Sequence, residues 1–79
     1  MDEQQIRARI QTLIAAGDVP CDTPERVYGG YGAGFLCSLC DARIPADTIE
    51  YEIDLPTGLR LRVHRRCQEI WLEECRTTA

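Results

Sequence analysis

The sequence has no lysine, only one histidine and no long apolar run, and the last two scarcities each argue against a class of function. Without a stretch of about 20 apolar residues, no membrane-spanning helix is expected. The charged start MDEQQIRAR is followed by no apolar signal-peptide core, so we expect a cytoplasmic location, where thiols stay reduced. Nine arginines against thirteen carboxylates leave a net charge of −4. This balance argues against broad nucleic-acid affinity, which requires many phosphates to be neutralised.

Cysteine, in contrast, is abundant, with five in 79 residues. A chain this short forms one domain, residues 1–79, and buries only about 60% of the surface that its unfolded form exposes. Small domains of this kind often depend on a metal, disulfides or a partner chain for stability. An odd number of cysteines leaves one unpaired in any disulfide scheme. In a reducing compartment, paired cysteines more often bind metal.

The N-terminal half predicts one helix and one loop. Apolar residues recur at helical spacing over residues 3–16, and Gly17 is a suitable stop for this helix. Residues 17–36 are rich in glycine and proline and are expected to form a loop, with a short strand around residues 26–28 left open. No GK[ST] follows the glycines, so they do not form a phosphate-binding loop. We interpret them as allowing the backbone to pass closely over the cysteine pair that follows.

Residues 48–63 predict a β-hairpin, and residues 65–76 predict a second helix. Pro56-Thr57-Gly58 suits a three-residue hairpin turn. The turn sets a register in which one face is apolar and the other carries opposite charges. The expected pairs are Leu55–Leu59, Asp54–Arg60, Ile53–Leu61, Glu52–Arg62 and Tyr51–Val63. The two arginines on the hairpin are therefore expected to form salt bridges rather than contact phosphates.

Four residues have the spacing of a zinc site: Cys37-x2-Cys40, then 23 residues, then His64-x2-Cys67. A two-residue gap lets both sulfurs of a tight turn face one ion, and residues three apart on a helix share a face. Thiolates and one imidazole suit tetrahedral Zn²⁺. We therefore predict one structural Zn²⁺ held by these four side chains. The alternatives are buried thiols beside a core histidine, and a redox-active Cys-x2-Cys pair.

The order of knuckle, hairpin and helix with ligands in its first turn resembles the treble-clef zinc finger over residues 35–76. The resemblance implies a small α+β fold, stabilised by metal, with an N-terminal helix, a zinc knuckle, a β-hairpin and a C-terminal helix. Asp41 departs from it, because such knuckles usually carry glycine after the second cysteine. The arrangement C-x2-C…H-x2-C-x3-W, ending at Trp71, is also similar to that of small proteobacterial zinc-binding proteins. That similarity implies zinc but no particular activity.

Two further cysteines lie outside the predicted site. Cys75 shares the apolar face of the second helix and is interpreted as a small buried apolar residue. Cys21 lies in the loop between Pro20 and Asp22. Either one remains an alternative metal ligand on sequence grounds. Trp71 is expected to fill the core between the second helix and the hairpin.

These features favour a binding role over catalysis. A zinc with four protein ligands has no open position, and the single histidine is used, so we expect no enzyme. Treble-clef nucleases of the HNH type would require further histidines. The first hypothesis is a protein–protein adaptor, monomeric or weakly dimeric, with no membrane contact. The second is a nucleic-acid-binding regulator using Arg43, Arg65 and Arg66. The first helix is expected to cover the apolar hairpin face; the alternative is that its stripe is free for docking.

Overall fold

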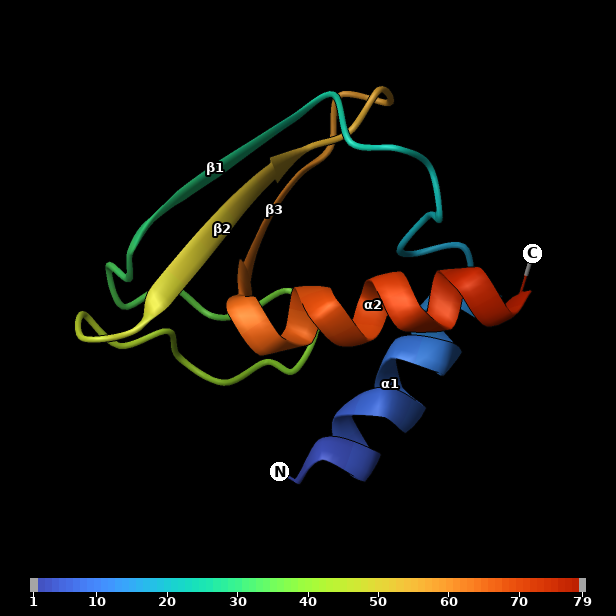
Figure 1. The fold of residues 1–79 in the computed structure, drawn as a ribbon, viewed down its shortest axis with the longest axis horizontal. Helices are drawn as coiled ribbons and strands as arrows, with labels where there is room; N and C mark the ends of the chain where they lie inside the picture. Colours follow the sequence, from blue (N-terminus) through green and yellow to red (C-terminus); the bar gives the residue numbers. More distant parts are fainter. Residues whose placement is uncertain (1, 79) are drawn as a thin grey trace.

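The computed structural model describes residues 2–78 and has an α+β fold (Figure 1). Its elements follow in the order α1 (Glu3–Ala15), β1 (Arg26–Tyr31), β2 (Ile49–Asp54), β3 (Arg60–His64) and α2 (Arg65–Thr78). The three strands form one antiparallel sheet in the order β1-β2-β3. The predicted fold class is therefore confirmed as a small α+β protein. Among the described residues, no helix is both long and apolar enough to cross a membrane.

Helix α1 begins and ends where its sequence provides caps. Asp2 Oδ1 accepts a hydrogen bond from the Gln5 amide, and Gln5 Oε1 accepts one from the Asp2 amide, both at 2.9 Å. This reciprocal pair satisfies two N–H groups that the first turn leaves free. Beyond the last turn, Gly17 has a φ of +78°, which glycine adopts at little cost. The helix predicted over residues 3–16 is thus confirmed.

The hairpin of β2 and β3 has the predicted register. Leu61 pairs with Ile53 and Val63 with Tyr51, and the Leu55 amide donates to the Leu59 carbonyl at 2.9 Å. On the other face, Arg60 contacts Asp54 at 2.6 Å and Arg62 contacts Glu52 at 3.0 Å. Both arginines therefore lie in cross-strand ion pairs, as expected from the alternation of the sequence.

Strand β1 lies within the stretch that was expected to be a loop. A short strand around residues 26–28 had been considered possible. The observed strand is longer, because all of Arg26–Tyr31 pairs with β2. The signal was weak, since two of its six residues are glycine and glycine disfavours strands. Pairing with an existing hairpin supplies the stability that local propensity does not. The sheet thus has a third strand at its edge.

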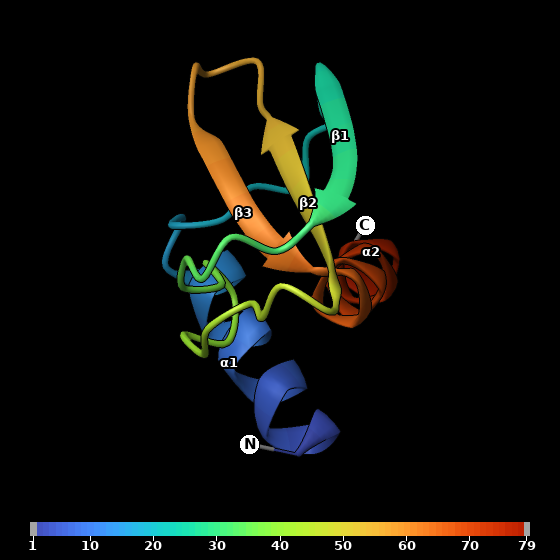
Figure 2. The ribbon, with the colours of Figure 1, turned by 90° about the vertical axis from the view of Figure 1, so that its left-hand side faces the viewer.

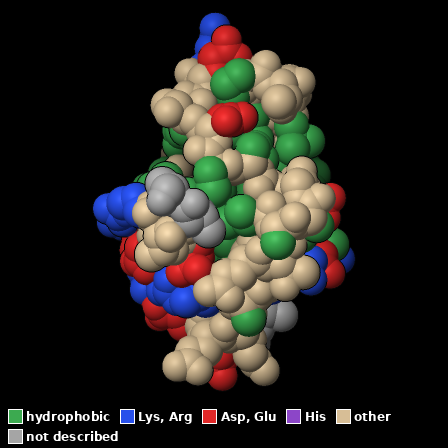
Figure 3. Space-filling model, turned by 90° about the vertical axis from the view of Figure 1, so that its right-hand side faces the viewer, with side chains coloured by type: hydrophobic (Ala, Val, Ile, Leu, Met, Phe, Trp, Pro, Cys, Tyr) green, Lys and Arg blue, Asp and Glu red, His purple; other side chains and the backbone are tan. Residues whose placement is uncertain are grey.

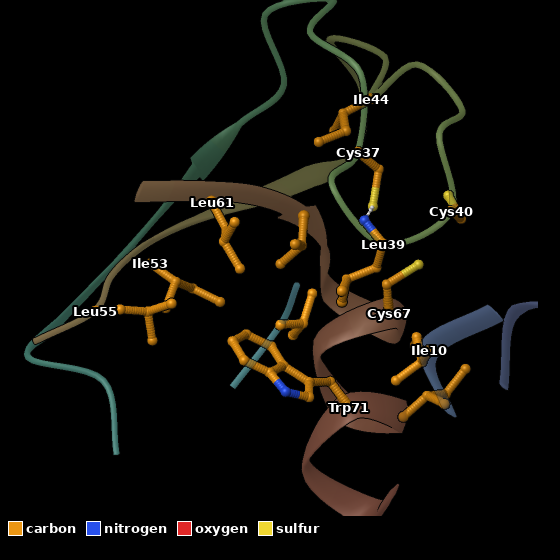
Figure 4. Packing of buried hydrophobic residues seen from close by; sticks show 13 residues of the cluster. Ile10, Cys37, Leu39, Cys40, Ile44, Ile53, Leu55, Leu61, Cys67 and Trp71 are labelled. Atoms are coloured by element: carbon orange, nitrogen blue, oxygen red, sulfur yellow. Dashed lines mark hydrogen bonds between the residues drawn. The ribbon is translucent and has the colours of Figure 1, made fainter. Parts of the chain in front are cut away.

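Helix α2 covers the sheet and forms the centre of the core. It packs against β2 and β3, and its Trp71 lies among apolar side chains from the sheet (Figure 4). Trp71 is buried, and its Nε1 donates to the Pro20 carbonyl at 3.0 Å. The predicted core position of Trp71 is confirmed. The hydrogen bond also ties the 17–25 segment to α2.

Helix α1 does not cover the hairpin, so this prediction was wrong. It packs against α2 on the side away from the sheet (Figures 1 and 2). Ile10 is fully buried in the same core cluster as Leu39 and Ile70. Arg7 adds ion pairs to Glu73 and Glu74, both at 2.7 Å. The apolar face of the hairpin is covered by α2 instead. The sequence alone did not show which surface the apolar side of α2 would cover.

Candidate metal centre

The first half of the candidate site is a tight turn at Cys37 and Cys40, called the knuckle below. The Asp41 amide donates to the Cys37 carbonyl at 2.9 Å, and the Cys37 amide donates to the Ala42 carbonyl at 2.8 Å. Asp41 has a φ of +63°, the left-handed conformation that aspartate tolerates better than most residues. The departure from glycine at this position therefore leaves the turn intact. Both thiols point inward and are buried.

The second half lies where β3 meets α2. His64 is the last residue of β3, and Cys67 lies in the first turn of α2. Three residues apart at this junction, the two side chains face the knuckle together. Pairing of β2 with β3 brings this junction back to the knuckle after the hairpin. The Ser38 amide donates to the Arg62 carbonyl at 2.8 Å, which fixes the knuckle against β3.

The four predicted ligands lie together. Cys37, Cys40, His64 and Cys67 each offer one donor atom, and these atoms all lie within 4.8 Å of one another. His64 Nδ1 is 3.4 Å from Cys40 Sγ and 3.8 Å from Cys67 Sγ. Around tetrahedral zinc with Zn–S bonds of about 2.3 Å, neighbouring sulfurs are roughly 3.8 Å apart. The cluster can therefore hold a metal ion, and its dimensions suit zinc.

The orientation of the His64 ring is fixed by a backbone carbonyl. Nε2 lies 3.1 Å from the Arg43 carbonyl oxygen, which can only accept a hydrogen bond. The proton of the neutral imidazole therefore belongs on Nε2, and the lone pair of Nδ1 faces the sulfurs. A metal-ligating histidine commonly makes such a bond through its other nitrogen. This contact gave no sequence signal, because it depends on where the 41–45 segment runs.

The three thiols influence one another strongly. The pKa of Cys37 is lowered, chiefly by a hydrogen bond from the Cys67 thiol, and the pKa of Cys67 is raised by the same bond and by burial. Burial also raises the pKa of Cys40. The Leu39 amide donates to Cys37 Sγ at 3.4 Å (Figure 4). A bound cation would stabilise all three sulfurs as thiolates.

A close backbone contact supports the knuckle from the outside. At Gly32, an added Cβ would lie 2.3 Å from the Pro45 carbonyl oxygen and 2.6 Å from that of Ile44. Only glycine lets the chain after β1 pass here, against the segment that positions His64. The glycine-rich stretch was expected to pass closely over the cysteine pair, but its close approach at Gly32 is to the Ile44 and Pro45 carbonyls beyond that pair.

Cys21 and Cys75 form a disulfide, which corrects the prediction for both residues. Their Cα atoms are 5.4 Å apart, and their positions in the sequence differ by 54. Cys75 is half-buried but is not a free apolar side chain, and neither sulfur belongs to the metal cluster. The spacing of the two residues carries no signal for a bond, because the bond depends on how α2 and the 17–25 segment meet. The expectation that the thiols stay reduced fails for this pair.

The arginines of the nucleic-acid hypothesis are engaged with other groups. Arg65 contacts Glu69 at 3.6 Å, and Arg66 contacts Glu69 at 3.0 Å and also pairs with Glu3. Arg43 donates to the Gly34 carbonyl at 2.7 Å. On the face drawn in Figure 3, basic side chains lie among acidic ones rather than in a separate area.

Comparison of the chain with family models, with curated proteins and with solved structures gave no match. The site is therefore defined by its own geometry.

Proposed function

We propose that this chain is a structural zinc module of the treble-clef type that docks on other proteins. The observation that carries the zinc assignment is the convergence of Cys37, Cys40, His64 and Cys67 within 4.8 Å. Three soft thiolates with one imidazole favour zinc over magnesium or calcium, which prefer oxygen ligands. Knuckle, hairpin and helix follow in the order that the treble clef would require.

In this proposal the metal replaces a missing helix cap. The first turn of α2 contains no acidic residue, and no Ser, Thr, Asp or Asn stands just before it. Zinc with three thiolates and a neutral imidazole has a formal charge of −1. At the start of α2, that charge would lie where the helix dipole and the free amides favour it. Zinc binding would thereby join the knuckle, the hairpin and α2 into one unit.

The proposed role is not catalytic. All four positions around a tetrahedral zinc would be taken by protein side chains, whereas catalytic zinc keeps a position for water or substrate. The ring of His64, the single histidine, would be occupied at both nitrogens, by metal and by the Arg43 carbonyl. No imidazole would then remain for acid–base chemistry.

A docking role is supported by the distribution of exposed apolar side chains. Of the seven large apolar side chains that are exposed among the described residues, five fall within residues 27–36. They are Val27, Tyr28, Tyr31, Phe35 and Leu36. Aromatic residues are enriched where proteins contact one another, and clustered exposed apolar groups often mark such surfaces. This segment, including β1, is the surface that we propose for protein contacts.

The alternative is a nucleic-acid-binding regulator. One observation favours it: Arg65 and Arg66, with Thr48 and His64, line a surface hollow of about 380 Å³ at the start of α2. Against it, both arginines already contact carboxylates, and the net charge is −4. Phosphate binding would have to compete with these ion pairs. We therefore favour the protein-binding role.

Two measurements test the proposal. Native mass spectrometry and elemental analysis of the purified chain should give one zinc per chain. Titration with duplex DNA near physiological salt should give no appreciable binding, because few arginine side chains are free to contact phosphates and so release counterions from the DNA. A tight, salt-dependent complex with DNA would instead support the alternative. Absence of zinc by both native mass spectrometry and elemental analysis would contradict the assignment of the zinc site.

A further inference from the structure

The two edges of the sheet differ in what covers them. At the β3 edge, Ser38 of the knuckle occupies the outward-facing groups of Arg62: its amide donates to the Arg62 carbonyl at 2.8 Å, and its Oγ accepts from the Arg62 amide at 3.3 Å. At the β1 edge, no other strand of the described residues pairs with the outer side of β1 (Figures 1 and 2). A free edge of this kind is a template for another strand.

The register shows which groups the free edge presents. The Gly32 amide donates to Thr48, the residue that continues the pairing of β1 with β2 beyond Tyr31 and Ile49. In an antiparallel pair, hydrogen-bonded positions alternate with positions whose groups point away. Arg26, Tyr28 and Gly30 therefore bond to β2. Val27, Gly29 and Tyr31 direct their amides and carbonyls outward.

The outward positions also lack the features that protect natural edges. Between Val27 and Tyr31 there is no proline and no charged side chain. Tyr31 is 75% exposed and Val27 is 45% exposed, because α2 packs on β2 and β3 but not on β1. Their side chains share the apolar face of the sheet with Ile53 and Ile49, their respective partners on β2. The apolar face is thus left uncovered along its β1 side.

We propose that β1 is a self-pairing edge, on which a second copy of this chain adds its own β1 antiparallel about a two-fold axis at Gly29. The partner is a second copy because β1 is complementary to itself in this arrangement. Val27 faces Tyr31 of the other copy twice, a β-branched residue against an aromatic one on the apolar face. On the other face, Tyr28 lies opposite Gly30, where the ring covers a residue that has no side chain. The two three-stranded sheets become one of six strands.

The area sets the strength of this dimer. An aromatic side chain covers about 150–250 Å² when buried, so covering Tyr28, Tyr31, Val27 and the strand backbone in both copies buries on the order of 1,000 Å². That is near the lower limit for specific interfaces. The dimer is therefore weak and forms as concentration rises. The inference deepens the protein-docking role proposed above by naming one surface and one partner, and it rests on the same zinc-held fold.

The test is sedimentation equilibrium of the zinc-loaded full chain over a wide concentration range, with amide hydrogen exchange at both ends of that range. The expected result is a monomer–dimer equilibrium. On dimerisation, the amides of Val27, Gly29 and Tyr31 gain protection, whereas those of Tyr28 and Gly30 are protected at every concentration. This alternation is not expected of any other contact surface. A zinc-loaded chain that stays monomeric throughout overturns the proposal.

Two variants sharpen the test. Val27→Pro removes an outward amide without removing a bond to β2, and Tyr31→Glu places a carboxylate against Val27 of the other copy. Because each change acts twice in a symmetric dimer, each is expected to raise the dissociation constant roughly tenfold or more. The control is Leu72→Glu on α2, since Leu72 is 48% exposed, as is Tyr28, and lies outside the edge. It should leave the constant unchanged.

Zinc content and circular dichroism are measured for each variant. A chain without zinc counts against the metal assignment, whereas a zinc-loaded dimer that is unaffected by both edge variants counts against pairing through β1.

Discussion

The two ends of α2 are held by sulfur in different ways. At its N-terminal end, Cys67 and the adjoining His64 face Cys37 and Cys40 in a reduced, buried cluster. At its C-terminal end, Cys75 is bonded to Cys21. With the proposed zinc, the first arrangement would require thiolates and a metal, whereas the second requires an oxidant. With zinc bound, the two ends of one helix would be held by linkages with opposite redox requirements.

The difference lies also in how each linkage is built. The metal cluster combines two local pairs, one set by a tight turn and one by the first turn of a helix. The geometry of each pair is set by the few residues around it. The disulfide joins a loop to the far end of a helix, and its geometry depends on the whole path between them. We therefore expect the cluster to control folding of the knuckle and hairpin, and the disulfide to restrain only the 17–25 segment.

Metal removal should have the largest effect. A strong chelator, applied without reductant so that the disulfide remains closed, is expected to unfold the knuckle, the hairpin and α2. Apparent zinc-binding free energies in zinc-finger peptides are about 10–16 kcal/mol, which equals or exceeds the whole stability of a typical domain, about 5–15 kcal/mol. Amide NMR spectra before and after verified metal removal provide the measurement. Native-like spectra of the metal-free chain would show that the disulfide and the core suffice.

Replacing single sulfurs should separate the two linkages. Cys37→Ser, Cys40→Ser and Cys67→Ser are each expected to lose zinc affinity by at least about tenfold, since a hydroxyl is a much weaker zinc ligand than a thiolate. Cys21→Ser serves as the matched control and should retain one zinc per chain. Competition with a chromophoric chelator measures each affinity. Equal loss of zinc in the Cys21 variant would mean that the ligand set is wrong.

The cluster and the hairpin were predictable because their signals are local. The turn at Pro56-Thr57-Gly58 fixes the register, and the two candidate ligands of each pair are three residues apart, in a tight turn or in a helix turn. Alternation of Arg60 and Arg62 with apolar residues also predicted which face is charged. These inferences need only the chain within a few residues of each site.

The remaining features depend on long-range packing. The full length of β1 was missed because its glycines hide a strand that forms only against β2. The predicted position of α1 was wrong because its apolar stripe could pack on either of two apolar surfaces, that of the hairpin or that of α2. The sequence did not show which one it would cover. The Cys21–Cys75 bond was missed because reduced thiols were expected in a cytoplasmic chain. The cytoplasmic location stays a prediction. The oxidation state of Cys21 and Cys75 in cells would test it.

Opening the disulfide should have a moderate effect and leave the metal in place. The double variant Cys21→Ser/Cys75→Ser is expected to lose about 2–4 kcal/mol of unfolding free energy, because the unfolded chain gains freedom. Denaturant unfolding of zinc-loaded protein measures this loss. Amides that exchange only through global unfolding should exchange faster in proportion to this loss, and amides of the 17–25 segment should show additional local exchange. An unchanged unfolding free energy would show that the Trp71 contact with Pro20 alone holds the segment.

The oxidation state of this pair also distinguishes compartments. Thiol labelling of protein taken directly from cells should find Cys21 and Cys75 bonded if the chain resides in an oxidising environment, and free if it resides in a reducing cytosol. The cytoplasmic prediction requires the second result. Because Cys21 is exposed, an external dithiol can reach this bond, whereas the cluster thiols are buried. Reductant is therefore expected to open the disulfide before it disturbs the metal.

The smallest effect is expected from the ion pairs that join α1 to the C-terminal half of α2, beside the disulfide. Hydrogen bonds from Arg7 lower the pKa of Glu73, and those from Gln11 and Arg7 lower the pKa of Glu74. A carboxyl whose pKa is lower in the folded chain than in the unfolded chain stabilises the fold at any pH above its unfolded pKa. This contribution is lost as the pH falls through the folded pKa. Arg7→Gln should therefore destabilise the chain slightly at neutral pH, and the difference should vanish in acid.

Carboxyl carbon shifts measured by NMR would follow this directly. In Arg7→Gln, the titrations of Glu73 and Glu74 should move upward, towards the ordinary range of glutamate. Arg65→Gln is the matched control, because Arg65 contacts Glu69 within α2 and, among the described residues, forms no ion pair with α1. It should leave both titrations in place. If Arg7→Gln also leaves them unchanged, the packing of Ile10, and not the ion pairs, holds α1 against α2.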